Sequence, residues 1–515
     1  MIVIGGGIGG LAAALRLAKR CQVTLVEKND RVGGKLGLWL APHPQRAPTD
    51  RPFRFDTGPS LLTMPFVFMD LFAAVGEDVR NHIQITRLDP IARFHWADGS
   101  HLDLRAGDDD LLLEVRRFAP GDVFGFKRLL ERGRRNWDLG EAFLSHAPEQ
   151  LMNGGKDGGS TGGGRLASLR MLTVPFRIGM LTRFSRVIDR HIKDQRLRDV
   201  LYQYATYSGA SPFRAPATLT VIPFVEHYFG GWHIQGGMYR LAEELEQTAR
   251  RLGVEIRTGA AVKQILIENN SAAGVRLEDG SEIRADAVIA NSDVVYTYRQ
   301  LVPRESRKHY TDSKLNHLDP GGSGVVIMLG VEGTYPQLSH HTKFMPTDYR
   351  RGDLNAMFES RTIPRDPCIY VCAPTRTDPS LAPEGCEMLF VLASAPPLPG
   401  KSIDWSIEGR RYRDRLLTTL ETKFGLTDLQ RRIVVERVIT PVDFQSMYNA
   451  NAGSIYGLAS NSLRSAFMRP PNRDRDIKHL YLTGSATHPG GGLPLVALSG
   501  KIVSELVSED LGLPS

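Results

Sequence analysis

Met1-Ile-Val-Ile-Gly-Gly-Gly-Ile-Gly-Gly10 opens the chain and decides its fold. A short hydrophobic strand runs directly into a glycine-rich turn, and the residues from Leu11 onward have the composition of a helix. Gly5, Gly7 and Gly10 have the spacing G-x-G-x-x-G, which marks a dinucleotide-binding unit when a strand precedes it and a helix follows. The opening stretch therefore predicts a βαβ unit that binds a dinucleotide.

Each glycine of this motif has its own physical role. Gly5 permits the tight turn, Gly7 lets the backbone approach a pyrophosphate, and Gly10 lets the helix pack on the strand. A second predicted strand ends at Glu27, about twenty residues beyond Gly7, where a carboxylate accepts hydrogen bonds from a ribose. A glycine turn in another kind of α/β unit is the alternative, and the acid in register disfavours it.

The residues after Glu27 distinguish between dinucleotides. Gly33 and Gly34 follow soon after the acid and suit a backbone that runs along a long, extended cofactor. This stretch resembles the acid-to-Gly-Gly segment of the flavoprotein superfamily that includes amine oxidases and carotenoid desaturases, and the resemblance implies FAD. Lys28 and Lys35 flank the glycines and are expected to contact the cofactor. A solvent-facing lysine and a turn without a ligand are the alternatives.

Composition limits the classes of protein to consider. The chain has 515 residues, more than one hydrophobic core usually serves, so we expect at least two domains. Its net charge of +7 is compatible with an anionic membrane or with nucleic acid. Because no aromatic and basic nucleic-acid module stands out in the sequence, we expect no nucleic-acid partner.

Cysteine usage and the first residues bear on the compartment. Four cysteines are too few and too scattered for a disulfide framework, and Cys368 and Cys372 lack the spacing of a zinc or thioredoxin motif. We therefore expect a reducing compartment and no metal site. A strand that begins at Met1 leaves no room for a cleaved signal peptide, unless the true start lies upstream of this chain. The predicted location is cytoplasmic, with the protein peripherally associated with the inner face of a membrane.

Two adjoining segments bear on membrane contact. Residues 153–164 are rich in glycine and are predicted to form a mobile surface loop. Residues 166–188 are apolar but are interrupted by Pro175 and by several arginines, which argues against a membrane-spanning helix. Such a basic amphipathic stretch can lie in a membrane interface. A helix pair that lines the protein's own pocket remains an equal alternative.

The middle of the chain is predicted to return to the first sheet. Apolar residues within 233–253 recur with a helical period, and Gly253 ends the predicted helix. Strands are predicted at 254–257, 260–267 and 285–291. We therefore expect the dinucleotide-binding domain to be discontinuous in sequence.

A second glycine-rich motif lies near the C-terminus. Residues 479–484 are typical of a strand that ends in Gly484, and the helix predicted after it has Pro494 in its first turn. Such a helix N-terminus offers unpaired amides and positive potential to an anion, such as the N1-C2=O region of a reduced flavin. His488 is the one titratable residue inside the motif. We consider two roles for it: orienting the ring or substrate with proton exchange, or only holding the turn.

Several motifs together resemble the carotenoid desaturases, the phytoene desaturase family of FAD-dependent oxidoreductases. Besides the opening fingerprint they are Phe55-Asp-Thr-Gly-Pro59, Gly236-Gly-Met238, Gly453-Ser-Ile-Tyr-Gly457 and Tyr481-Leu-Thr-Gly-Ser-Ala-Thr-His-Pro-Gly-Gly-Gly-Leu-Pro494. Residues 66–76 and 204–214 look most like the 1-hydroxycarotenoid 3,4-desaturase branch. The stretch 153–164 looks unlike the usual loop of the family.

The resemblance implies a fold and a set of site residues. The expected fold is α/β, with a Rossmann-like, glutathione-reductase-type FAD-binding domain made of residues 1–60, 226–300 and 451–515. Residues 61–225 and 301–450 are expected to form an α+β substrate domain with a partly helical, membrane-facing region. The residues expected to bind FAD are Gly5, Gly7, Gly10, Glu27, Lys28, Gly33, Gly34, Lys35, Gly58, Pro59, Val262, Asn291, Gly484, Gly491, Gly492, Leu493 and Pro494.

The activity that the resemblance implies is desaturation of a carotenoid or a related long polyene by hydride transfer to FAD, with a quinone or oxygen as the electron acceptor. The protein then mainly positions and desolvates the substrate, so neither a strong base nor a metal is required. The alternatives are a carotenoid isomerase or saturase that uses reduced FAD, a flavin amine oxidase, and a non-catalytic flavin-binding membrane protein.

A long hydrophobic substrate requires an apolar tunnel outside the dinucleotide-binding domain. Seven aromatic residues are candidates to line it, and core packing is the alternative for each of them. They are Phe66, Phe68, Phe72, Phe224, Tyr228, Phe229 and Trp232.

Overall fold

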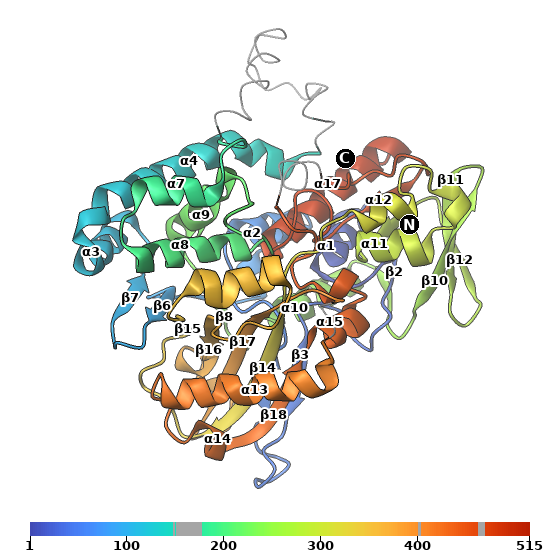
Figure 1. The fold of residues 1–515 in the computed structure, drawn as a ribbon. Coiled ribbons are helices and arrows are strands. Elements are labelled where there is room, and N and C mark those ends of the chain that lie inside the picture. Colours follow the sequence, from blue (N-terminus) through green and yellow to red (C-terminus); the bar gives the residue numbers. More distant parts are fainter. Residues whose placement is uncertain (148–149, 151–177, 400–402, 462–468, 515) are drawn as a thin grey trace.

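A computed structural model describes residues 1–147, 150, 178–399, 403–461 and 469–514 (Figure 1). The glycine-rich stretch 153–164 and most of the predicted interfacial segment 166–188 lie outside these residues. Within the described ranges, no helix is both long enough and apolar enough to cross a membrane.

A five-stranded parallel sheet forms around the opening strand. It brings together strands from the beginning, the middle and the end of the chain, as the discontinuous motifs predict. In spatial order the strands are β19 (Leu480–Leu482), β13 (Val288–Ala290), β1 (Ile2–Ile4), β2 (Thr24–Val26) and β9 (Glu255–Arg257). In the three central strands β13, β1 and β2, every residue except Thr24 is buried, because helices cover the sheet.

Three helices pack beside this sheet in one hydrophobic core. They are α1 (Ile8–Leu17), α10 (Arg240–Arg251) and α17 (Leu493–Leu511). Figure 1 shows α17, from the C-terminal end of the chain, beside α1. Small residues make this contact close, because a Cβ atom on Gly500 would lie 2.6 Å from the carbonyl oxygen of Gly9.

The helix predicted within 233–253 begins only at Arg240. His233 instead belongs to strand β8 (Trp232–Ile234), which pairs with β5 (Ile85–Arg87). The carboxylate of Asp56 accepts hydrogen bonds from the amides of Met238 and Tyr239, both at 2.8 Å, and so satisfies the donors at the start of the helix.

A seven-stranded mixed sheet forms the second layer of the molecule. Its spatial order is β18 (Ile433–Ile439), β14 (Ser323–Glu332), β17 (Cys386–Ala395), β16 (Ile369–Cys372), β15 (His341–Phe344), β6 (Ala92–His95) and β7 (His101–Leu104). Further strands form smaller sheets. Strand β3 (Leu38–Ala41) pairs with β4 (Phe53–Asp56). Strand β11 (Ser271–Leu277) pairs with β10 (Val262–Glu268) on one side and with β12 (Glu282–Arg284) on the other. Helix α13 (Trp405–Thr422) packs against the large sheet.

A helical layer packs at the β6–β7 end of the large sheet, at the upper left of Figure 1. It consists of α3 (Asp108–Phe118), α4 (Val123–Ser145), α7 (Phe184–His191), α8 (Gln195–Thr206) and α9 (Val221–Phe229). These helices share one hydrophobic cluster with β6 and β7.

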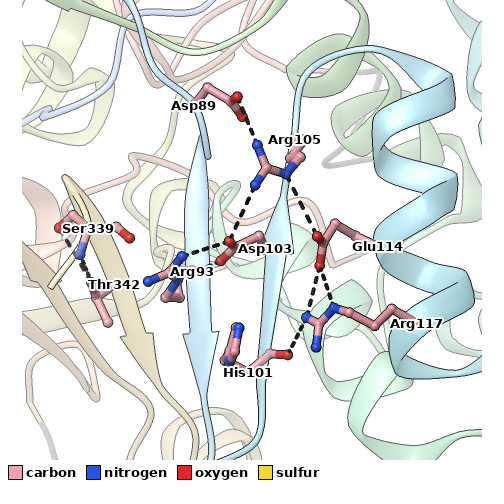
Figure 2. A network of polar contacts seen from close by, with 9 residues as sticks. All are labelled: Asp89, Arg93, His101, Asp103, Arg105, Glu114, Arg117, Ser339 and Thr342. Atoms are coloured by element: carbon pink, nitrogen blue, oxygen red, sulfur yellow. Dashed lines mark hydrogen bonds and ion pairs between the residues drawn. The ribbon is translucent and has the colours of Figure 1, made fainter. Parts of the chain in front are cut away.

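Charged side chains fasten this helical layer to the large sheet (Figure 2). Arg93 on β6 makes two hydrogen bonds to the buried carboxylate of Asp103 on β7, at 2.6 and 2.8 Å. Although burial acts to raise the pKa of Asp103, the hydrogen bonds and charge of Arg93 lower it overall. Arg105 then contacts both Asp103 and Glu114 of α3. The network holds the β6–β7 hairpin against α3.

The architecture confirms the expected α/β class, with a discontinuous Rossmann-like unit and a separate sheet that serves the substrate region. The exact boundaries expected for the two domains stay a prediction.

Candidate functional site

The carboxyl ends of β1, β2, β13 and β19 open onto a cavity of about 790 Å³. Ligands of parallel α/β sheets bind at this edge. All the predicted FAD-binding residues except Gly10 line the cavity: Gly5, Gly7, Glu27, Lys28, Gly33, Gly34, Lys35, Gly58, Pro59, Val262, Asn291, Gly484, Gly491, Gly492, Leu493 and Pro494. The fold thus brings residues from both ends and the middle of the chain to one site.

Asn291 joins the two glycine-rich turns. Its Nδ2 atom donates a hydrogen bond to the carbonyl of Gly5 at 3.1 Å, and a Cβ atom on Gly484 would lie 2.9 Å from its Oδ1 atom. Gly10 lies behind the turn, where a Cβ atom would be 2.2 Å from the carbonyl oxygen of Gly5. Its role is therefore close packing, as the spacing of the motif predicts.

Two helix N-termini face the cavity. Helix α1 begins after Gly7 and helix α17 after Gly492, and glycine has no side chain with which to cap the first amides. Gly492 has a φ of 114°, a conformation that other residues rarely adopt. Unpaired amides and the helix dipole favour an anion at such an end. The site can therefore bind a diphosphate at α1 and stabilise negative charge on a flavin ring at α17.

Glu27 is buried at the end of β2 and is already oriented. Its Oε2 atom accepts one hydrogen bond, from the amide of Gly6 at 2.8 Å, and its Oε1 atom accepts two from Asn29, from the backbone amide and from Nδ2, both at 2.9 Å. A carboxylate oxygen can accept a second hydrogen bond. The geometry therefore suits the ribose contact that the sequence predicts.

The two predicted lysines reach across to residues 446–455. Lys28 donates hydrogen bonds to the carbonyl of Ser446 at 2.7 Å and to Asn449 at 2.9 Å. Lys35 donates to the carbonyls of Ser454 and Ile455, and burial lowers its pKa to about 8. Both side chains line the cavity, and their contact with the cofactor stays a prediction.

Arg469 is a site residue that the sequence motifs miss. It lines the cavity beside the C-terminal turn, where a Cβ atom on Gly490 would lie 3.2 Å from its Nε atom. Burial lowers its pKa to about 10, so the guanidinium stays charged at neutral pH. It adds positive charge to the end of the cavity at which α17 begins. A single arginine outside a motif carries no sequence signal.

His488 lies behind the cavity wall. The ring is buried, packs edge-on against Phe143, and has its Nε2 atom 3.0 Å from the carbonyl oxygen of His146. Burial lowers its pKa to about 4, so the ring is neutral at pH 7. It does not line the cavity within the described part of the chain. Its surroundings favour the turn-holding role, and the catalytic role stays a prediction.

The rest of the cavity is mostly apolar and extends between the helical layer and the large sheet. Its lining includes Trp137, Phe143 and Leu144 of α4, Ile222 and Val225 of α9, and Phe390 and Leu392 of β17.

The seven aromatic residues predicted to line a tunnel do not line this cavity, so that prediction is wrong. The face of each helix decides which side chains reach it. Phe224 and Tyr228 stack on each other under the guanidinium of Arg134, while Ile222 and Val225 of the same helix line the cavity. Helical period alone does not tell which of two apolar faces meets a cavity.

Ionisable groups are buried in the cavity wall away from the glycine turns. Glu226 of α9 accepts a hydrogen bond from Tyr204 at 2.8 Å, and Lys343 of β15 donates one to Tyr207 at 2.7 Å. Burial raises the pKa of Glu226, although the charge of Lys343 opposes this, and burial lowers the pKa of Lys343. Buried charges in an apolar wall are costly and often mark function.

A glycine-lined anion cradle that continues into an apolar cavity is typical of a flavoprotein oxidoreductase. Residues 8–508 match the family of flavin-containing amine oxidoreductases, and the chain belongs to this family. Its cofactor is FAD, and the residues of the cradle fit it.

Relatives with known names support the same class. The chain is 35% identical to the 4,4'-diapolycopene oxygenase of a Methylomonas species, over 99% of this chain and 98% of that protein. It is 34% identical to the zeta-carotene-forming phytoene desaturase of Myxococcus xanthus, over 98% and 93%. A solved oxidoreductase structure from Methanosarcina mazei covers 98% of this chain and 99% of its own, with a TM-score of 0.64 at 18% identity, which supports the fold alone. The resemblance to carotenoid desaturases is confirmed.

Replacing Glu27 by alanine should weaken FAD binding by about tenfold or more, because charged hydrogen bonds to the ribose are lost. Flavin absorbance per protein after gel filtration, and titration calorimetry of the FAD-depleted protein, measure this. Asp30→Ala on the same loop is the matched control, since Asp30 is exposed. Equal flavin retention in the two variants would contradict the role of Glu27.

Proposed function

We propose that this protein uses FAD to desaturate a carotenoid or a related long polyene. The observation that carries the proposal is the continuity of one cavity from the flavin cradle into an apolar space between α4, α9 and the large sheet. A hydrocarbon chain fits such a lining, and the named relatives act on carotenoids or their precursors. Bound FAD supplies a hydride acceptor.

The protein's own residues then have three tasks. The apolar lining excludes water and holds two adjacent carbon atoms of the substrate at the flavin. The N-terminus of α17 and Arg469 stabilise negative charge that develops at the flavin. The third task is to accept the proton that leaves the second carbon, and we assign it to Glu226, whose buried carboxylate faces the cavity.

A second candidate is oxidation of the end of the polyene, as in the name of the diapolycopene oxygenase relative. Product analysis separates the two reactions. The purified FAD-loaded protein is incubated with acyclic polyenes in lipid vesicles, with oxygen or a soluble quinone as the acceptor. We expect a product that has lost two hydrogen atoms per step and absorbs at longer wavelength, because each new double bond extends the conjugation.

Other outcomes of this assay decide against the proposal. A product that has gained oxygen would favour the second candidate. Isomerisation without change of mass would indicate a polyene isomerase. Reduction of the bound flavin by simple amines, with no change in any polyene, would indicate an amine oxidase.

The variant Glu226→Gln tests the proton acceptor. Glutamine can keep the contact with Tyr204 but cannot take up a proton at neutral pH. We expect turnover to fall by about a hundredfold with unchanged FAD content. In the wild type, turnover should rise with pH as Glu226 ionises at its raised pKa, and the variant should lose this rise. Glu131→Gln, on the exposed side of α4, is the control. Unchanged turnover in Glu226→Gln would exclude the assignment.

We also propose that the protein binds peripherally to a membrane, from which it takes its substrate. The helical layer that covers the cavity exposes large apolar side chains: Phe124 of α4 is 86% exposed and Leu181, before α7, is 66% exposed. The sequences of α4 and α7 also contain several arginines. An apolar and basic surface of this kind suits an interface with anionic lipids.

Vesicle flotation tests this surface. Phe124→Asp combined with Leu181→Asp should reduce binding of the FAD-loaded protein to vesicles that contain anionic lipid by about tenfold, since two apolar anchors become charged. Ile407→Asp is the matched control, because Ile407 is 50% exposed on α13, beside the large sheet. Equal loss of binding in both variants, or none in either, would contradict the assignment.

A further inference from the structure

Three histidines and a cysteine gather in the protein interior, beside the paired strands β15 and β16 of the large sheet. His340 and His341 lie at the start of β15, and Cys372 ends β16 directly opposite His341. His233 comes from β8. All four side chains are buried. The ring centres of His233 and His340 are 4.8 Å apart, and those of His340 and His341 are 4.5 Å apart.

The two neighbouring histidines each use one ring nitrogen and leave the other unused. The Nδ1 atom of His340 lies 2.7 Å from the hydroxyl of Thr377, and that of His341 lies 2.7 Å from the hydroxyl of Tyr370. The Nε2 atoms of both rings have no hydrogen-bond partner among the described residues. Buried polar atoms normally have a partner, and an unmade hydrogen bond costs about 1–3 kcal/mol. The arrangement therefore points to a missing ligand.

Ligand atoms of three of these side chains are close enough to share one ion. One ligand atom each from His340, His341 and Cys372 lie within 4.8 Å of one another. In a zinc site the metal–nitrogen distance is about 2.0 Å and the metal–sulfur distance about 2.3 Å, so the ligand atoms end about 3.5 Å apart. Small side-chain rotations close this difference.

His233 packs against the ring of His340 and is the nearest candidate for a fourth ligand, although it lies outside the group of three. Neither of its ring nitrogens has a hydrogen-bond partner among the described residues, and its Nε2 atom lies 3.7 Å from a carboxylate oxygen of Asp378. A carboxylate behind a ligating histidine orients the ring toward the metal. A cavity of about 20 Å³ lies beside Cys372 and His233, and it is not lined by His340 or His341.

The protonation states agree with this geometry. Burial lowers the pKa of all three histidines, that of His341 to about 3, so the rings are neutral and can ligate at pH 7. Burial raises the pKa of Cys372, so its thiol keeps its proton until a metal displaces it.

We propose that His233, His340, His341 and Cys372 form a closed binding site for one divalent transition-metal ion of the zinc class. Three imidazoles and one thiolate are a donor set that zinc prefers, in tetrahedral geometry. The ion ties β8 to the paired strands β15 and β16. His341 and Lys343 lie on the same strand, β15, and both line the large cavity. The ion therefore stiffens the part of the cavity wall that carries Lys343. This site is independent of the proposed reaction.

Metal analysis of the FAD-loaded protein tests the site. The protein is incubated with Zn²⁺, passed through gel filtration, and analysed for metal per flavin by plasma mass spectrometry. We expect about one zinc per flavin in the wild type, and affinities lowered by about tenfold or more in Cys372→Ser and His340→Gln. Cys386→Ser and His43→Gln are the controls, since both residues are buried away from the cluster and should keep the metal.

X-ray absorption at the zinc edge of the wild-type protein gives a second measurement that does not depend on the folding of variants. We expect one sulfur at about 2.3 Å and nitrogen ligands at about 2.0 Å. Zinc at background level in the wild type would overturn the proposal and would leave buried water as the partner of these nitrogens. So would equal zinc content in the wild type, Cys372→Ser and His340→Gln, or a zinc spectrum without sulfur.

Discussion

The close contact of α1 with α17 is the constraint on which the rest of the structure depends. Each helix starts at a glycine turn that follows a strand of the parallel sheet, and both N-termini must point into the same cavity. Gly9 and Gly500 leave no room for side chains between the two helices. The packing aligns two positive helix ends at a distance set by the sheet, which suits one long anionic cofactor better than two separate ligands.

The large sheet explains how one cavity can serve a charged cofactor and an apolar substrate. Along β15, side chains alternate between the two faces, so that His341 and Lys343 reach the cavity while Phe344 packs into the core behind it. The same alternation places Phe390 and Leu392 of β17 in the cavity wall. Most of the lining is therefore apolar, and the few ionisable groups occupy defined positions in it. Charges in such surroundings interact strongly, because little water screens them.

The histidine and cysteine cluster lies at the edge of this same wall. Three of its members contact polar side chains: Thr377 and Asp378 behind the cavity, and Tyr370, which itself lines the cavity. Two kinds of interaction therefore fix the cavity wall. Strand pairing fixes the positions of the backbone, and buried polar contacts fix the orientations of the side chains behind it. Rigidity of this kind helps to hold a reacting carbon at a fixed place.

The sequence by itself determined the cofactor class and the parallel sheet, because the glycine spacing, Glu27 and the C-terminal motif are local patterns whose geometry is nearly independent of the rest of the chain. It also indicated the discontinuous domain, since 254–257 and 285–291 are recognisable strands. Only the tertiary structure decided which apolar faces line the cavity, where His488 points, and that His233, His340, His341 and Cys372 meet. These outcomes depend on the register of the strands and on the rotation of the helices, which are set by segments that can lie more than a hundred residues apart. In a strand, a shift of one residue moves a side chain to the opposite face of the sheet.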